Sequence, residues 1–195
     1  MSSTSHTTSS PALSRERLGL LLGFVGVAIF GGTLPATRIA VSAIDPLAMT
    51  ALRTAIAGLC ALALLIALRR PLPPRRLWPQ LAIAMLCVSI AFPFLMALGM
   101  QTVDASHGGV VLGILPIATA LVAVAITHER PRPLFWIASL AGAALVIAFA
   151  LRQGGGAISA GDIFLFAAVA VSSIGYAFSG KLTSQMPGWE VISWV

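Results

Sequence analysis

The stretch DASHGGVVLGILPIATALVAVAITHERP, residues 104–131, decides the fold of this chain. Between Asp104 and Glu129 it carries no formal charge, and most of its residues are small or branched and apolar. An α-helix rises about 1.5 Å per residue, so this run is long enough to cross a hydrocarbon core of about 30 Å. It has no polar face to turn toward water. We therefore expect a transmembrane helix here.

The rest of the chain has the same character. Hydrophobic residues make up 58% and charged residues 9%, with a mean hydropathy of +0.97, whereas a soluble domain carries roughly 25% charged residues. We therefore predict an all-α integral membrane protein, a polytopic helix bundle whose first partner is the lipid bilayer. The net charge of +6 comes from basic residues between apolar runs, without the clustered aromatics of nucleic-acid binding, so we expect no nucleic-acid partner.

Six apolar runs are long enough to cross a membrane, and we predict helices at residues 18–41, 46–68, 77–100, 106–127, 134–151 and 162–181. Residues 1–14 are small and polar, and we expect a disordered cytoplasmic tail. A seventh run begins at Trp189 and reaches Val195, too short to cross, as if the sequence were cut off within a helix.

The positive charges predict the orientation. If six helices alternate in direction, all but one of the basic residues between the helices lie on one side, at Arg15, Arg17, Arg69, Arg70, Arg75, Arg76, Arg130, Arg132 and Lys181. The opposite loops hold Asp45, Asp104, Asp162 and only Arg152. By the positive-inside rule we expect a cytoplasmic N-terminus and a multi-pass protein of a bacterial-type inner membrane.

Two arginines within apolar runs are candidates for a substrate path. Arg53 lies about 10 Å below the outer surface at the helical rise, and a charge there should face protein or water. The sequence leaves two interpretations open, an arginine that reaches outward to Asp45 or Asp104 and an arginine in a substrate cavity. For Arg38 we favour the outward orientation, because it lies about one membrane thickness after Arg17.

Prolines interrupt three of the predicted helices, and each frees the carbonyl four residues earlier. Pro35, Pro93 and Pro116 thereby free the carbonyls of Gly31, Ser89 and Leu112. In lipid these carbonyls need partners, so the kinks should face other helices or a wet cavity. Pro93 and Pro116 could equally be simple bends.

The proline at Pro35 follows Gly31, Gly32 and Thr33, a cluster that predicts a weakened helix of the kind transporters use for midplane sites and hinges. Small residues at close-packing intervals also predict tight helix crossings, at Gly19 and Gly23, Gly109 and Gly113, and Ala138 and Gly142.

Polar residues at helix ends are candidates for gating rather than catalysis. Glu129 closes a helix against its dipole, so it either pairs with neighbouring arginines in water or joins an inner gate. His107 and Ser106 are adjacent on one helix and point about 100° apart, which suits an outer-end histidine better than a catalytic pair. Asp162 has no second intramembrane aspartate with which to form a protease pair. We therefore expect no enzyme activity.

Cys60 and Cys87 lie inside apolar runs and should behave as small hydrophobic residues. The spacing of Cys and His matches no zinc site. We accordingly expect neither a metal nor a cofactor.

A weak internal repeat aligns Phe30-Gly31 with Ile174-Gly175, and Pro46 with Pro187. A unit of five helices re-enters the membrane from the opposite side, so a second copy would be inverted. The stretches FGGTLPATRIAVSAIDPLAMTALRTAIAGL, VVLGILPIATALVAVAITHER and GDIFLFAAVAVSSIGYAFSGKL together resemble the EamA-type transporters of the drug/metabolite transporter superfamily over residues 18–195.

This resemblance implies a first five-helix repeat at residues 15–152 and the start of a second at 153–195, within a ten-helix fold of inverted repeats. It implies a secondary transporter or permease that moves metabolites, amino acids or drugs, often outward, by alternating access. The family's characteristic residues fall on Phe30, Gly31, Arg53, Pro116, Glu129, Gly161 and Asp162.

The alternative is a truncated, non-transporting membrane subunit or remnant that needs a partner chain. The substrate, the direction of transport, the coupling ion and the oligomeric state stay open.

Overall fold

The computed structural model describes residues 11–127, 131–152 and 159–195, and within the described residues every regular element is a helix. The first predicted helix consists of α1 (Pro11–Gly31) and α2 (Thr33–Ala40), and the second is α3 (Pro46–Ala67). The third joins a short 3-10 turn, η1 (Arg75–Leu77), to α4 (Trp78–Ala84), the π-helical segment η2 (Met85–Ala91) and α5 (Phe92–Gly99). The fourth is split into α6 (Ala105–Leu112) and α7 (Leu115–Thr127).

The fifth and sixth predicted helices are α8 (Pro133–Arg152) and α9 (Ala160–Leu182), and the short α10 (Gly188–Trp194) follows. Five helical stretches are long and apolar enough to cross a membrane, namely Arg17–Ala40, Pro46–Ala67, Arg75–Gly99, Ala105–Ile126 and Ala160–Leu182. In α8 the apolar helical stretch that the structure describes is shorter, Pro133–Leu145. The prediction of an all-α, polytopic membrane protein is confirmed.

The N-terminal boundary differs from the prediction, because α1 begins at Pro11 and so includes residues 11–14. Proline fits the first turn of a helix, where an N–H would have no intrahelical partner, and its fixed φ starts the helix. The rest of the predicted tail, residues 1–10, lies outside the described residues.

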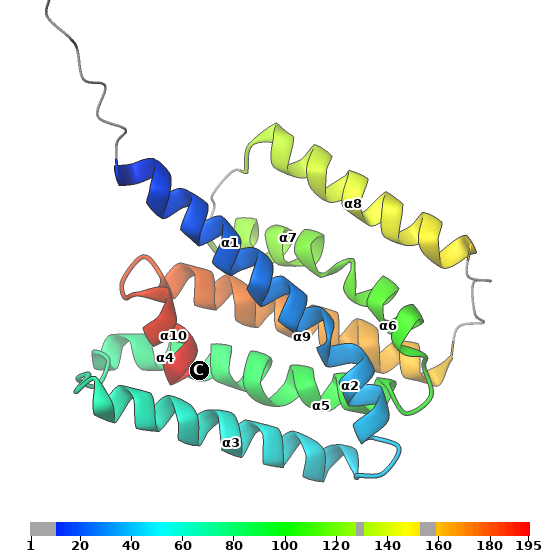
Figure 1. The fold of residues 1–195 in the computed structure, drawn as a ribbon, viewed down its shortest axis with the longest axis horizontal. Helices are drawn as coiled ribbons and strands as arrows, with labels where there is room; N and C mark the ends of the chain where they lie inside the picture. Colours follow the sequence, from blue (N-terminus) through cyan, green and yellow to red (C-terminus); the bar gives the residue numbers. More distant parts are fainter. Residues whose placement is uncertain (1–10, 128–130, 153–158) are drawn as a thin grey trace, which may run out of the picture.

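Successive long helices run in opposite directions along the bundle (Figure 1). The loops from α3 to α4 and from α9 to α10 lie at one end of the bundle, and those from α2 to α3 and from α5 to α6 lie at the other. The first end therefore carries Arg70 and Arg75, and the second carries Asp45 and Asp104. The separation of positive from negative loops that the sequence predicts is thus compatible with the arrangement of the helices.

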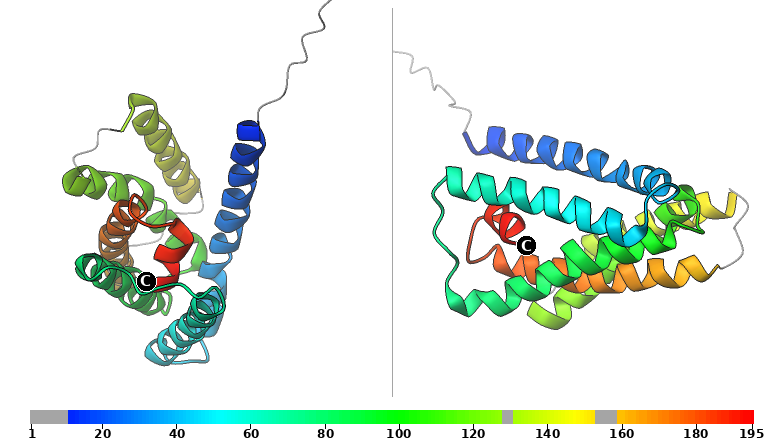
Figure 2. Two further views of the ribbon diagram at one scale, coloured as in Figure 1. Left: turned by 90° about the vertical axis from the view of Figure 1, so that its left-hand side faces the viewer. Right: turned by 90° about the horizontal axis from the view of Figure 1, so that it is seen from below.

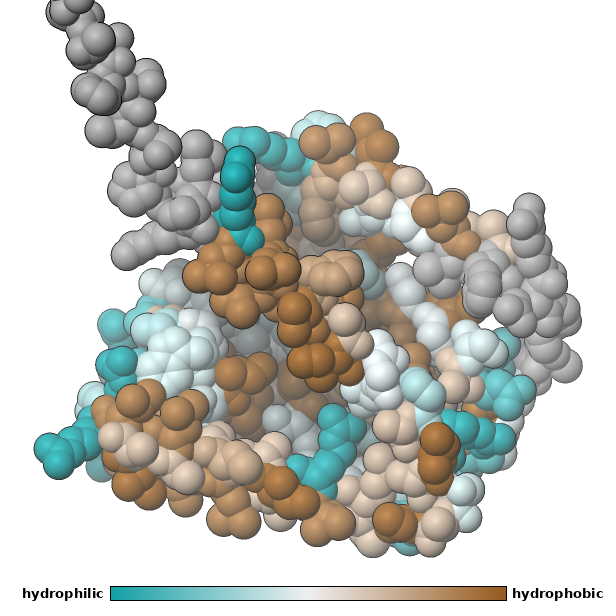
Figure 3. Space-filling view, viewed as in Figure 1, coloured by the Kyte–Doolittle hydropathy of each residue, from teal (hydrophilic) through white to brown (hydrophobic). Residues whose placement is uncertain are grey.

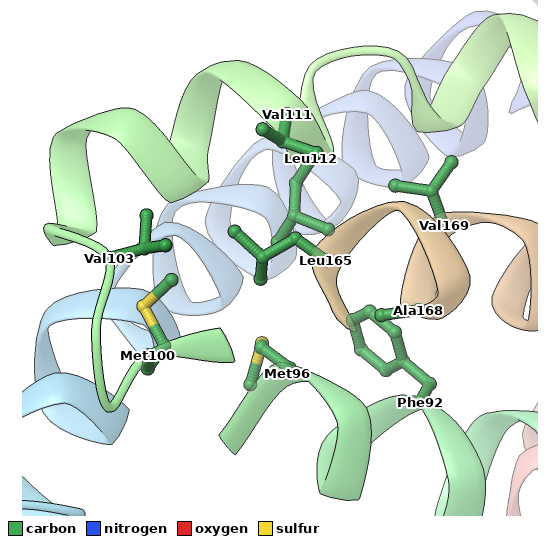
Figure 4. Close-up of a cluster of buried hydrophobic side chains, with 9 residues drawn as sticks. All are labelled: Phe92, Met96, Met100, Val103, Val111, Leu112, Leu165, Ala168 and Val169. Atoms are coloured by element: carbon green, nitrogen blue, oxygen red, sulfur yellow. The ribbon is translucent and has the colours of Figure 1, made fainter. Parts of the chain in front are cut away.

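Helix α9 is the centre of the packing, in contact with α4, η2, α5, α6 and α7. Its buried Leu165, Ala168 and Val169 meet Phe92 and Met96 of α5 in one hydrophobic cluster (Figure 4). The cluster is completed by Met100, Val103, Val111 and Leu112. These side chains come from α5, α6, α9 and the loop between α5 and α6, which therefore form a common core.

Helix α1, by contrast, packs against little of the protein. None of the apolar stretch of this first membrane span is buried inside the described structure. Figure 2 shows α1 standing clear of the helices around α9. Its last turn does reach the core helices, where the rings of Phe30 and Phe92 stack with centroids 6.5 Å apart. The α1–α2 unit is therefore anchored at its broken end and open along its length.

Glycines set the close approach of α9 to its neighbours. An added Cβ at Gly175 would lie 2.5 Å from Val88 Cγ2 and 2.8 Å from Cys87 Cβ, and one at Gly161 would lie 2.3 Å from Thr102 Oγ1. By contrast, a Cβ at Gly19, Gly23 or Gly142 would meet no atom within 4 Å. The tight crossings predicted at those three positions are thus absent from the described chain, because interval alone does not say which face meets another helix.

We predict that Gly175→Ala destabilises the protein by about 1–3 kcal/mol, the usual cost of overpacking. The new methyl must displace η2, whose backbone nitrogen of Val88 lies 3.3 Å from it. Thermal unfolding of the purified chain in nanodiscs gives the measurement. The matched control is Gly180→Ala on the same helix, where the methyl meets no atom within 4 Å. Equal melting temperatures for the two variants would contradict this account of the α9 interface.

Candidate functional site

A pocket of about 550 Å³ lies where the broken first helix faces α6. One wall is the junction of α1 and α2, with Phe30, Gly31 and Pro35, and the other is α6, with Ser106 and Gly109. Figure 3 shows that this face of the molecule is hollowed beside α1. Among the pocket residues only Ser106 has a polar side chain. The pocket is large enough for a small organic molecule.

Both walls of the pocket contain a helix break. Gly32 ends α1, and its N–H bonds to Ile29 O at 3.2 Å in a tighter turn before α2 begins. On the other wall Gly113 and Ile114 separate α6 from α7. Pro35 has no N–H to give to the Gly31 carbonyl, and Pro116 has none for the Leu112 carbonyl. Gly31 and Leu112 both line the pocket, so each break leaves a carbonyl acceptor beside it.

The third proline is compensated in a different way. Pro93 cannot bond to the carbonyl of Ser89, and the hydroxyl of Thr54 on α3 donates to that oxygen at 2.9 Å. The wider turns of η2 precede the proline, as expected where the regular ladder is interrupted. The kink at Pro93 therefore faces a neighbouring helix and serves to join α3 to the core, away from the pocket.

Arg53 has no carboxylate partner among the described residues. The acidic side chains that the structure describes are bound elsewhere: Asp45 Oδ1 caps α3 by accepting from Leu47 N at 2.9 Å, and Asp104, Asp162 and Glu190 pair with other residues. Among the described ionisable groups, Tyr176 on α9 lies near enough to influence Arg53 electrostatically. Arg53 is exposed, lies within a membrane-spanning helix and is not one of the residues that line the pocket.

Arg38 lies at the end of the bundle that carries Asp45 and Asp104. It donates to the carbonyl of Met100, and its Nη2 lies 3.9 Å from Asp104 Oδ1. These contacts tie the end of α2 to the loop before α6. Thr33, also a candidate, lies in the first turn of α2 beside the pocket wall.

A second outer pair joins His107 on α6 to Asp162 on α9, with 2.8 Å between Nε2 and Oδ1. The other carboxylate oxygen, Oδ2, accepts from the backbone N–H of Ser159 at 2.6 Å. Sequence reasoning placed both residues at the outer side without pairing them. The one indication of this pair in the sequence was that both residues lie at the same depth, on the fourth and sixth predicted helices. Nothing in the sequence shows that these two helices are in contact there.

At the opposite end Arg70 connects α3 to α10. Its Nη1 lies 3.2 Å from Glu190 Oε1, and its guanidinium lies 4.9 Å from the ring centroid of Trp189. Sequence reasoning proposed Glu129 for an inner ion pair, but Glu129 lies outside the described residues. Glu190 was missed because it follows Trp189 in a run that seemed too short to matter. No group of three or more His, Cys, Asp or Glu among the described side chains could hold a metal ion.

Residues 17–152 match the EamA-like transporter family. The chain is 48% identical over 182 residues to a Bacillus subtilis (strain 168) protein called "Uncharacterized transporter YdeK". That alignment covers 93% of this chain and 63% of the relative, so the chain spans less than two thirds of the relative's length. No solved structure matches.

We predict that Thr54→Val destabilises the protein by about 1 kcal/mol, because the carbonyl of Ser89 loses its donor within the membrane. Thr54→Ser keeps the hydroxyl and should stay near the wild-type melting temperature. In a Pro93→Ala background the backbone N–H at position 93 can serve Ser89, so the same Thr54→Val change should cost less. A cost unchanged by Pro93→Ala would contradict the compensation.

Proposed function

The chain belongs to the EamA-like transporter family, and from this premise we propose that it forms the substrate path of a secondary transporter for small molecules that carry an anionic group. The observation that supports this best is the pair of helix breaks that face each other across the 550 Å³ pocket. Broken helices at a cavity combine a binding site with hinges, as alternating access requires.

In this proposal α1 and α2 move relative to each other at Gly32, and α6 moves relative to α7 at Gly113. The core of α5 and α9 stays fixed, because its side chains are close-packed. A small rotation of the α1–α2 unit would open the pocket toward one side and close it toward the other. The transporter is a multi-pass membrane protein, and we propose a cytoplasmic N-terminus from the distribution of basic loops.

Arg53 supplies the charge selectivity. A guanidinium without a carboxylate partner can give charge-assisted hydrogen bonds to a carboxylate, phosphate or sulfate. Tyr176 on α9 lies near enough to influence Arg53 electrostatically and carries a hydroxyl. Substrate binding would therefore neutralise a charge that the protein itself leaves without an acidic partner in its described part.

The test is a comparison of metabolites in the growth medium of cells that express the full chain, measured by mass spectrometry. We expect anionic metabolites to accumulate with the wild type and to fall to the empty-vector level with Gly109→Leu. An added Cβ at Gly109 meets only Leu34 Cδ1, at 3.7 Å, so the larger side chain fills the pocket. Gly180→Leu, where the added Cβ meets nothing within 4 Å, is the control for bulk alone. Export that survives Gly109→Leu would exclude the pocket from the path.

The alternative is a subunit that works only with a partner chain, and the open length of α1 favours it. Its signature is a wild-type chain that exports nothing alone and copurifies in fixed stoichiometry with another membrane protein. Export by the purified chain in liposomes would exclude it.

We predict that Arg53→Gln lowers export of anionic metabolites by about tenfold or more, the value of one lost hydrogen bond to a charged group. Arg53→Lys should lose less, because it keeps the charge without the planar fork of donors. Arg76→Gln, an exposed arginine in η1, serves as the control and should export normally. Equal export by Arg53→Gln and Arg76→Gln would remove Arg53 from the proposal.

A further inference from the structure

We propose that His107 and Asp162 form a proton-binding site, and that its occupancy controls the position of α6, one wall of the pocket. The proposal deepens the transport function above and rests on it in one respect, since it names the proton as the species coupled to the substrate. The geometry of the pair is independent of any substrate.

The acidic member of the pair is almost completely enclosed. The side chain of Asp162 is 3% exposed, and both of its oxygens are engaged, Oδ1 with His107 Nε2 and Oδ2 with Ser159 N. Asp162 also lies in the first turn of α9, where the helix dipole favours a negative charge. The carboxylate is therefore a fixed acceptor held by the core helix.

The basic member can exchange protons with water. The side chain of His107 is 30% exposed, and imidazole is the side chain that ordinarily gains and loses a proton between about pH 5 and pH 8. With His107 neutral, Nε2–H donates a hydrogen bond to the charged carboxylate. With His107 protonated, the same contact joins two opposite charges and becomes an ion pair. Proton binding thus tightens the link between α6 and α9.

The other charged groups around His107 do not replace this contact. Asp104, at the start of the same helix, is 85% exposed and lies 3.9 Å from Arg38. Arg38, on α2, also bonds to the carbonyl of Met100. On α8 the one charged residue is Arg152, whose side chain lies outside the described residues. Helices α5 and α7 carry no charged residue.

Helix α6 contacts both α9 and the pocket, so a change in its contact with α9 can alter the pocket. It is a single short element between the loop that carries Asp104 and the break at Gly113. On one side Ser106 and Gly109 line the pocket. On another side Gly108 is seated so closely that an added Cβ would lie 2.3 Å from Met100 Cε and 3.7 Å from Leu165 of α9. The residues that face the pocket and those that face α9 alternate along two turns.

The structure shows α6 held on α9 and the pocket open. A protonated His107 stabilises this arrangement, and loss of the proton weakens the link and lets α6 move toward α2. Acid conditions should therefore keep the pocket accessible, and alkaline conditions should reduce its accessibility.

The experiment measures access to the pocket through a thiol at position 106. The full chain with Cys60→Ala, Cys87→Ala and Ser106→Cys is placed in nanodiscs and labelled with a hydrophilic maleimide from about pH 5 to about pH 8. The same chain with His107→Gln, which keeps a hydrogen-bond donor but does not titrate, is labelled in parallel. Because the charge of His107 changes the ionisation of the adjacent thiol, each rate is first divided by the rate of a small thiol reagent on the same chain at the same pH. The ratio of the two quotients then reports access to the pocket.

We expect the ratio to be near one at the alkaline end and to rise about fivefold on acidification, the lower end of ordinary coupling between sites. Asp104→Asn, which neutralises the neighbouring exposed carboxylate, should leave the rise unchanged. A ratio that stays flat or falls on acidification overturns the proposal, as does a rise that Asp104→Asn abolishes.

This measurement separates the proton site from the transport function. If no anion is exported and the ratio still rises, the transport proposal fails while the proton-binding site stands. If export is observed, its dependence on pH should be lost in His107→Gln. Export with an unchanged pH profile in His107→Gln would overturn the coupling.

Discussion

The structure depends on one property of the lipid bilayer: its hydrocarbon core offers no hydrogen-bond partner to a backbone N–H or C=O group. Each of the prolines Pro35, Pro93 and Pro116 removes an N–H, and each resulting free carbonyl has to be accommodated. At Ser89 a hydroxyl from α3 supplies the bond, and the kink becomes part of the rigid core. At Gly31 and Leu112 the carbonyls lie beside a pocket, and the kinks become part of the site.

The bilayer also restricts which charged side chains can be left without a partner. A carboxylate in or near the hydrocarbon region needs a partner, and each described one has a capping backbone, an arginine or a histidine. Arg53 is a basic side chain that lacks such a charged partner among the described residues. Because no carboxylate among the described side chains pairs with it, the described helices retain a positive charge that a ligand can neutralise. The imbalance is a structural argument for an anionic substrate that composition alone does not supply.

The sequence predicted well whatever depends on length and hydropathy. The helices at residues 46–68 and 162–181 are observed as Pro46–Ala67 and Ala160–Leu182, because an uninterrupted apolar run in lipid has no alternative to a helix. The weakened helix at Gly32 and Pro35 was also predictable, since proline and glycine act locally.

The pairings within the site were not predictable from the sequence. His107 with Asp162 and Arg70 with Glu190 each join helices distant in the chain. Hydrophobic periodicity is weak in a helix that is apolar on all sides, so the sequence does not say which face meets which neighbour. The tight crossings expected at Gly19 and Gly142 were wrong for this reason.

The glycines divide the molecule into a rigid part and a movable part. At Gly99, Gly108, Gly161 and Gly175 an added Cβ would lie within 3.0 Å of another atom, and each of these positions belongs to α9 or to an element packed on it. At the pocket the situation is reversed, since a Cβ at Gly31 meets nothing within 4 Å. Close packing without spare volume permits few arrangements, whereas open glycines beside a break permit several. Helix α6 has both kinds, Gly108 against the core and Gly109 against the pocket. It is therefore the element through which a change at the core interface would reach the pocket.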